Sequence, residues 1–325
     1  MLALMWSGCY LPARMKPCCF LGLLLATTSL ALAQDDSLKL DDVIQRSQQW
    51  LQENVDENVI ESLPQLDQEK VQPLFRDLQA RFQGDYVFDL AALKETALAV
   101  LPLLEASEAT RPYAEWLRTR LDYLEVADEF RLSLPPPKAE PGQPLTRGPN
   151  PSPELERKVW QKQVAKGPHA PWAVEYAERL KPLFAAQGVP TQLVWIAEVE
   201  SSFHPNARSP AGAVGLFQLM PSTTRWLGLA LRPKDERIEP AKSAEAAAKY
   251  LKYLYGRFQD WPLVMAAYNA GESHVRSLLD RHQAKTFDQI STRLPAETQM
   301  YVPRIDATLQ RREGVTLIQL QAPRA

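Results

Sequence analysis

Apolar residues recur at three- and four-residue spacing through most of the 325-residue chain, the spacing of helices that bury one face. Before residue 131 this spacing predicts four helices, in the stretches DDVIQRSQQWLQENV, EKVQPLFRDLQARF, DLAALKETALAVLPLLEAS and PYAEWLRTRLDYLEVADEF. Roughly six further helical segments follow residue 154, judged by the same periodicity. No stretch of any length alternates apolar and polar residues as a strand would. The pattern therefore predicts an all-α protein.

Proline separates the two helical regions. Eight prolines lie between Pro135 and Pro153, a density at which a helix cannot continue. Such a segment is either an extended, semi-rigid linker or a strap lying across the next domain, and the sequence leaves both open. We therefore predict a small helical N-terminal domain at 34–130, a Pro-rich linker at 131–153 and a second helical domain at 154–325.

The first residues are typical of an export signal. Arg14 and Lys16 precede the apolar run FLGLLLATTSLALA, which ends in an A-x-A site and predicts a signal peptide at 1–33. The run is too short to span a bilayer comfortably, so membrane association is the weaker interpretation. Either Met1 or Met15 could be the true start. We expect an exported, periplasmic protein, soluble or peripherally attached to the cell envelope.

Charge and cysteine content narrow the chemistry. Lys plus Arg number 37 against 39 Asp plus Glu, so no excess of positive charge suggests a nucleic-acid partner. All three cysteines (Cys9, Cys18 and Cys19) fall within the predicted signal peptide. We therefore expect the exported chain to contain no disulfide, thiol nucleophile or thiolate metal site.

A glutamate stands where an apolar helix breaks into the loop SSFHPNARSPAGAVGLFQLMP. On that helix, Glu200 continues the apolar face that carries Leu193 and Ile196, whereas Glu198 should point elsewhere. A carboxyl on an apolar face near a helix C-terminus should have a raised pKa, which suits a general acid near neutral pH. The alternative is that the helix simply emerges into water at Glu200.

The loop after Glu200 is rich in Pro and Gly, which predicts a compact connection. Gly215 would let a ligand or a backbone segment approach closely. Gln218 and Ser209 could line a groove beside Glu200. Gly215 and Gln218 could equally belong to a tight turn that contains one satisfied buried amide.

Four stretches, ESSF, PNARSPAGAVGLFQLMP, AAYNAGESHV and LPAETQMYVPRI, together resemble the soluble lytic transglycosylase catalytic domain. That family has the lysozyme-like fold shared with goose-type lysozyme, and the motifs are most similar to those of the membrane-bound lytic transglycosylase D type. One departure is Phe217, which stands where the family often has Met or Trp. A bulky apolar residue is retained there, so we expect little effect.

The resemblance implies a role for each matching residue. Glu200 would be the catalytic acid/base, followed by Ser201 as a structural hydrogen-bonding residue of the Glu-Ser pair. The other residues it brings to the substrate site are Ser209, Gln218, Tyr268, Asn269, Glu297 and Tyr301. The substrate would be the glycan strands of peptidoglycan, and the fold class would be an all-α, lysozyme-like catalytic domain preceded by a small helical domain.

Two carboxylates usually flank a glycosidic bond during cleavage. The obvious second candidates here, Glu198 and Glu272, lie on the wrong helix face and just past a helix end. The resemblance resolves this, because a lytic transglycosylase needs one carboxyl and its substrate supplies the other groups. It also implies that neither a metal nor an organic cofactor is required.

Three other interpretations stay open. A goose-type hydrolase would use water on the same substrate, and a wall-binding protein would have lost catalysis. The N-terminal helices could bind a cell-envelope protein. Several aromatic residues could pack against sugar rings. Of these, we expect Trp226 and Tyr255 to lie in the core instead, whereas Tyr253 could contact a sugar.

Overall fold

The protein is described by a computed structural model that covers residues 78–106, 108–133, 148–167 and 171–324. The predicted signal peptide, the first part of the predicted N-terminal domain and most of the linker lie outside these residues. The described α-helices are α5 (Lys94–Ala106), α6 (Arg111–Ser133), α7 (Pro153–Lys166), α8 (Pro171–Ala186), α9 (Ile196–Ser201), α10 (Pro221–Trp226), α11 (Pro240–Phe258), α12 (Trp261–Ala270), α13 (Glu272–His282), α14 (Phe287–Ile290) and α15 (Ala296–Glu313). Short 3₁₀ turns are η2 (Val87–Leu93), η3 (Thr191–Trp195), η4 (Glu236–Ile238), η5 (Ser291–Arg293) and η6 (Leu317–Gln319).

The predicted all-α class is confirmed for the described residues. Their only extended pairing consists of two isolated bridges, Arg208 with Val214 and Val214 with Leu219, inside the loop after α9. No described helix is long and apolar enough to cross a membrane.

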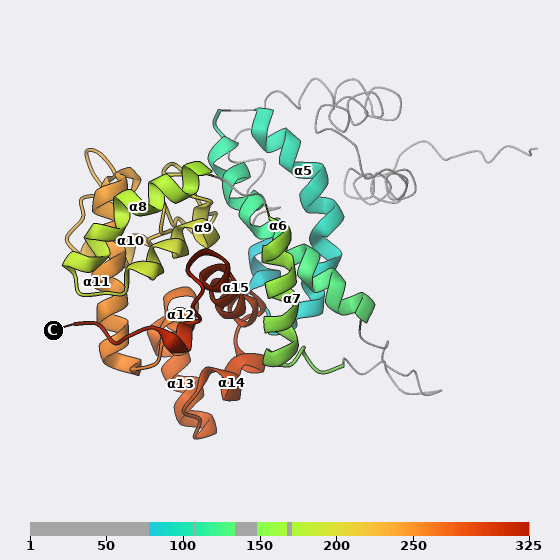
Figure 1. The fold of residues 1–325 in the computed structure, drawn as a ribbon. Helices are drawn as coiled ribbons and strands as arrows, with labels where there is room; N and C mark the ends of the chain where they lie inside the picture. The colour runs from blue at the N-terminus through green and yellow to red at the C-terminus, as the bar shows by residue number, and fades with distance from the viewer. Residues whose placement is uncertain (1–77, 107, 134–147, 168–170, 325) are drawn as a thin grey trace, which may run out of the picture. The chain divides into compact units, whose positions relative to one another are not determined.

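Helix α15 lies at the centre of the described structure, with α6 and α7 on one side and α12 on the other (Figure 1). Nearly every residue from Ala296 to Leu309 is buried, on all sides of this helix. Polar residues that face inward from α15 must therefore find partners within the protein. This position brings α15 against α9, the helix that carries Glu200.

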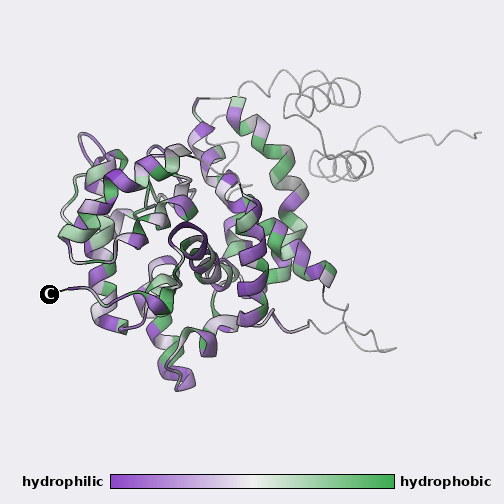
Figure 2. Ribbon diagram, viewed as in Figure 1, coloured by the Kyte–Doolittle hydropathy of each residue, from purple (hydrophilic) through white to green (hydrophobic). Residues whose placement is uncertain are grey.

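The helices before the linker share their apolar core with those after it. The ring of Tyr123 on α6 packs edge-on against Trp160 on α7 at 5.1 Å and against Phe82 at 6.1 Å. The Arg304 guanidinium of α15 lies over both Tyr123 and Trp160, at 4.9 and 5.4 Å from the ring centroids. Helix α5, apolar over most of its length, packs against α6 (Figure 2). The predicted boundary at 131–153 stays a prediction, but the helices on its two sides bury one continuous core.

A carboxyl without a hydrogen-bond partner among the described residues is buried at the start of α7. Glu156 is 1% exposed, and neither of its carboxyl oxygens has a hydrogen-bond partner among the described residues. Burial raises the pKa of Glu156 well above its ordinary 4.5, against the opposing effect of Arg157. The folded protein therefore holds a proton at Glu156 that the unfolded chain releases above pH 4.5.

We expect this proton to make stability depend on pH. Because the folded state binds more protons, the free energy of unfolding should fall as pH rises above 4.5, by up to about 1.4 kcal/mol per pH unit until the folded carboxyl ionises. Glu156→Gln should flatten this part of the profile. Urea unfolding of both proteins between pH 4.5 and 8 measures it, and equal slopes for the two proteins would contradict the assignment.

Candidate active site

Glu200 is buried near the end of the short helix α9. The segment predicted as one helix begins as the 3₁₀ turn η3 and continues as six α-helical residues. The helix stops because Ser202 and Phe203 adopt left-handed backbone angles, with φ of 48° and 59°. Glu200 is only 4% exposed, so its place on the apolar face is confirmed. The alternative, in which Glu200 emerges into water, is wrong.

The Glu200 carboxyl is held by groups from two other helices. Tyr301 of α15 donates its hydroxyl hydrogen bond to Oε1 at 2.7 Å. Arg120 of α6 lies 3.9 Å from Oε2 and donates to the Glu200 backbone carbonyl at 3.2 Å. Burial raises the pKa of Glu200 to about 7, although Arg120 and Tyr301 both act to lower it. The raised pKa expected from the sequence is therefore confirmed, and the carboxyl is half protonated near neutral pH.

The two other candidate carboxylates are occupied elsewhere. Glu198 forms a two-point ion pair with Arg312 of α15, at 2.8 and 2.9 Å. Glu272 accepts hydrogen bonds from Tyr253 and Arg257, each at 2.8 Å. The prediction that neither shares the environment of Glu200 is confirmed.

The loop after α9 is held by its own polar residues. Ser201, fully buried, donates to the Leu216 carbonyl at 2.8 Å, which fits the structural role expected for it. Ser209 accepts a hydrogen bond from the Ala213 amide at 3.0 Å. The Gln218 amide nitrogen donates to the carbonyls of Ala207 and Gly215, at 3.1 and 2.9 Å. These three side chains thus shape the loop, and substrate contact by Ser209 or Gln218 stays a prediction.

A close contact between backbone segments requires glycine at position 215. Its φ is +87°, and a Cβ placed there would lie 2.0 Å from the carbonyl oxygen of Arg237. The Arg237 side chain in turn donates to the carbonyls of Gly212 and Leu219, both at 2.8 Å. Arg237 therefore fixes the loop from outside, a role that the sequence motifs did not indicate.

The remaining predicted site residues come from α12 and α15. Tyr268, half-buried, donates its hydroxyl to the Phe217 carbonyl at 2.7 Å and so ties α12 to the loop. Asn269 accepts from the Thr298 hydroxyl at 2.5 Å. Glu297 accepts from Arg120 at 2.9 Å. The structure thus brings Tyr301 to the Glu200 carboxyl, Glu297 to the Arg120 guanidinium beside that carboxyl, and Tyr268 against the loop that follows it.

Exposed aromatic side chains lead from the surface to Tyr268. Trp226 is 58% exposed and Tyr253 is 40% exposed, with their ring centroids 4.7 Å apart. Tyr250 contacts Trp226 at 6.2 Å, Tyr253 at 6.4 Å and Tyr268 at 5.5 Å. We call these four residues the aromatic ridge.

The prediction that Trp226 packs in the core is wrong. Helix α10 is only six residues long and leaves Trp226 uncovered at its end. Tyr255 is half-buried and packs against Trp261 at 4.6 Å, as expected.

Sequence reasoning missed Arg120, which lies far from all four motifs. Its signal was nevertheless present. On α6, Arg120 shares a face with the buried residues Trp116, Tyr123 and Ala127 by helical spacing, as Glu200 does on its own helix. A charge on an apolar face needs a buried partner, and Arg120 and Glu200 meet in the folded protein.

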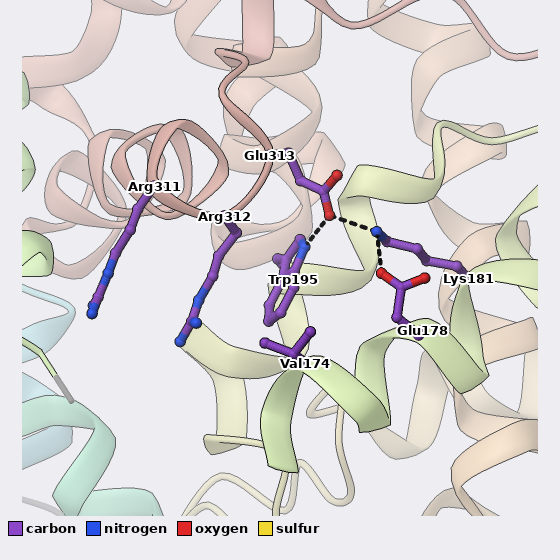
Figure 3. Close-up of a pocket in the computed structure, with 7 residues that line it drawn as sticks. All are labelled: Val174, Glu178, Lys181, Trp195, Arg311, Arg312 and Glu313. Atoms are coloured by element: carbon purple, nitrogen blue, oxygen red, sulfur yellow. Dashed lines mark hydrogen bonds and ion pairs between the residues drawn. The ribbon is translucent and has the colours of Figure 1, made fainter. Parts of the chain in front are cut away.

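Two surface cavities lie next to one another but do not include Glu200. One, of about 270 Å³, is shown in Figure 3, where Glu313 accepts from the Trp195 indole and pairs with Lys181. The other, of about 420 Å³, is lined by residues that include Trp172 and Arg304. Among the described residues, no three His, Cys, Asp or Glu side chains are grouped so that they could hold a metal ion.

Comparison with known proteins places the loop and most of the site in one domain family. Residues 184–291 match the Transglycosylase SLT domain. Membrane-bound lytic murein transglycosylase D of Escherichia coli K12 is 40% identical over 123 residues, which are 37% of this chain and 27% of that protein. Soluble lytic murein transglycosylase of Salmonella typhimurium is 37% identical over 90 residues, 26% of this chain and 14% of the relative. Peptidoglycan transglycosylase gp16 of Escherichia phage T7 is 40% identical over 83 residues, 25% and 6% of the two chains.

The resemblance seen in the motifs is confirmed: residues 184–291 match the SLT domain, and they lie within an all-α frame. The chain is similar there to membrane-bound lytic murein transglycosylase D, although it spans only about a quarter of that relative's length. Glu200, Ser209, Gln218, Tyr268 and Asn269 fall inside the matched residues. Tyr301 and Arg120, which face the Glu200 carboxyl, lie outside them, as does Glu297, the partner of Arg120.

Proposed function

We propose that the protein is a peptidoglycan lytic transglycosylase, which cleaves the β-1,4 bond between N-acetylmuramic acid and N-acetylglucosamine without water. The observation that carries this proposal is a single buried carboxyl inside an SLT domain, Glu200, whose pKa is raised by burial to about 7. A carboxyl that is half protonated at neutral pH can give up a proton and take one back in a single cycle.

The first step is protonation of the leaving group. Tyr301 donates its hydrogen bond to Oε1 of Glu200, so the acidic proton is carried by Oε2. Glu200 passes this proton to the glycosidic oxygen while the bond from C1 of the muramyl residue to that oxygen breaks. The acetamido oxygen of the same sugar stabilises the positive charge at C1, as in substrate-assisted glycosidases.

The second step returns the proton and closes a ring. The Glu200 carboxylate, stabilised by Tyr301 and Arg120, takes the proton of the C6 hydroxyl. The C6 oxygen then bonds to C1, which gives a 1,6-anhydromuramyl end and leaves Glu200 protonated again. The atoms balance without water, metal or cofactor.

The state of the other carboxylates favours this one-carboxyl chemistry over hydrolysis. A hydrolase of the goose-lysozyme kind needs a second group to activate water. Glu198 and Glu272 are held in their own ion pairs, and Glu297 is bonded to Arg120.

The aromatic ridge gives a surface on which sugar rings can bind. Sugars present apolar C–H faces that pack against exposed aromatic rings, and the ridge ends at Tyr268 beside the loop that follows Glu200. We propose that the ridge binds the glycan strand, and that Ser209, Gln218, Tyr268 and Asn269 contact it nearer to Glu200. Strands of this polymer lie in the cell envelope, which fits the predicted export. Binding of an envelope protein by the N-terminal helices stays a prediction.

Trp226→Ala tests the ridge. Loss of one exposed indole should raise KM for soluble glycan strands about five- to tenfold, with little change in kcat, because stacking affects bound substrate and transition state alike. Trp172→Ala is the matched control, since Trp172 is also exposed (50%) but lines the second cavity instead. An equal effect of both substitutions on KM would contradict binding of the glycan strand by the aromatic ridge.

The reaction itself is tested by counting ends. Isolated peptidoglycan is digested with residues 34–325, and soluble fragments and new reducing ends are measured in one sample. Fragments without reducing ends are expected. One reducing end per cut would identify a hydrolase instead, and no fragments from several types of peptidoglycan would identify a binding protein.

A further inference from the structure

A buried cation from outside the SLT domain stands between two carboxyls. Arg120 of α6 is 6% exposed and donates through Nη2 to Glu297 at 2.9 Å. Through Nη1 it donates to the Thr119 hydroxyl at 2.8 Å and to the Glu200 backbone carbonyl at 3.2 Å. Its guanidinium also lies over the Trp116 ring, 5.2 Å from the centroid. These contacts fix the guanidinium on several sides.

The distances show that the cation is shared unequally. Nη2 of Arg120 forms a close ion pair with Glu297 but stays 3.9 Å from the Glu200 carboxyl, beyond hydrogen-bonding distance. Glu297 thus offsets part of the positive charge that favours the ionised form of Glu200. In a buried site such a charge acts strongly, so removing either partner should change the protonation of Glu200.

We propose that Arg120 and Glu297 are positioning residues: a buried charge pair that orients Glu200 and sets the pH range over which Glu200 transfers its proton. The inference rests on the proposed function for its catalytic consequence only. Arg120 lies on α6 and Glu297 lies past residue 291, so the pair is supplied by segments on both sides of the matched SLT domain.

The other titratable groups around Glu200 do not replace this pair. From α15, Arg304 is bonded to Asp122 at 2.6 Å, while Tyr301 is the donor to Glu200 itself. The phenols that face Glu200 from α6, α12 and α15 are Tyr123, Tyr268 and Tyr301; burial raises the pKa of each, so all three stay neutral. On α9, Glu198 is paired with Arg312.

The pair predicts shifts of opposite sign. In Arg120→Gln, the lost cation and the uncompensated Glu297 should both raise the pKa of Glu200, by about one to three pH units. The alkaline limit of activity should move up by the same amount, because the first step needs protonated Glu200. In Glu297→Gln, the uncompensated Arg120 should lower the pKa and move that limit down. Arg120→Lys keeps the charge but loses the planar fork, so it should keep the pH range and lower kcat.

The experiment follows the Glu200 carboxyl by ¹³C NMR in protein labelled at glutamate carboxyls, with the signal assigned by its absence in Glu200→Gln. The pH profile of fragment release is recorded alongside. Opposite shifts in both readouts are expected. If the NMR shifts are opposite but the unsubstituted protein releases no fragments, the pair is supported and the proposed function is overturned. Equal or absent NMR shifts would overturn the pair, whatever the activity.

A single substitution that leaves one charge buried could prevent folding. The double variant Arg120→Met/Glu297→Gln removes both charges and should fold. The pKa of Glu200 in the double variant should lie between its values in the two single variants. If Glu297→Gln is the only single variant that folds, the pKa in the double variant should be higher than in Glu297→Gln. A double variant that titrates no higher than Glu297→Gln would contradict the proposal.

Discussion

Glu200→Gln is expected to lower kcat for fragment release by about 10³- to 10⁴-fold, at the upper end of what loss of a general acid costs. Glutamine has nearly the same shape and can still accept the hydrogen bond of Tyr301. It cannot deliver a proton to the glycosidic oxygen or take one from the C6 hydroxyl. The loss should therefore fall on kcat at every pH, with KM and the melting temperature little changed. Rates of release from soluble glycan strands measure it.

Glu198→Gln is the matched control on the same helix. Glu198 lies two residues away and pairs with Arg312, so its substitution removes a partly buried ion pair without touching the Glu200 carboxyl. We expect activity within a few-fold of the unsubstituted protein and a lower melting temperature. Similar loss of kcat in both variants would mean that α9 tolerates no change, and the assignment of the acid to Glu200 would fail.

The second large effect concerns the helices before the linker. A chain of residues 149–325, without α5 and α6, is expected not to fold cooperatively, whereas residues 34–325 should. The shared core loses the buried side chains of Phe82, Tyr123 and Phe130 and uncovers Trp160. Each large core side chain removed costs about 3–5 kcal/mol, and whole domains have only about 5–15 kcal/mol to lose. Thermal unfolding followed by near-ultraviolet circular dichroism compares the two chains.

A milder substitution separates packing from the charge of Arg120. Phe82→Ala should cost about 3–5 kcal/mol of unfolding free energy while leaving the pH profile of activity unchanged, because Phe82 contacts Trp116 and Tyr123 but not Glu200.

For the truncated chain, cooperative melting of residues 149–325 within a few degrees of the longer chain would show that the two cores are independent.

Local periodicity predicted much of this structure. It gave the all-α class and placed Glu200 on a buried face, apart from Glu198. The same argument predicted the raised pKa of Glu200, since burial is its main cause. These features depend on residues close together in the chain, where helical spacing determines which side chains share a face.

The sequence did not show which distant residues meet in the folded protein. Arg120 stands 80 residues before Glu200, and no local pattern states which buried charges will meet. The exposure of Trp226 depends on how short α10 is, and element boundaries are poorly determined by periodicity. The role of Gly215 depends on the backbone of Arg237, 22 residues further along the chain, which lies against it.

In the proposed reaction one carboxyl cleaves the strand, and the oxygen that closes onto C1 comes from the sugar itself. Digestion of peptidoglycan in water enriched in ¹⁸O, with mass spectrometry of the fragment ends, tests this directly. We expect ends one water lighter than hydrolytic ends, with no heavy oxygen incorporated. One heavy oxygen per cut would show that water attacks C1, and the assignment of Glu200 as the only reacting carboxyl would be contradicted.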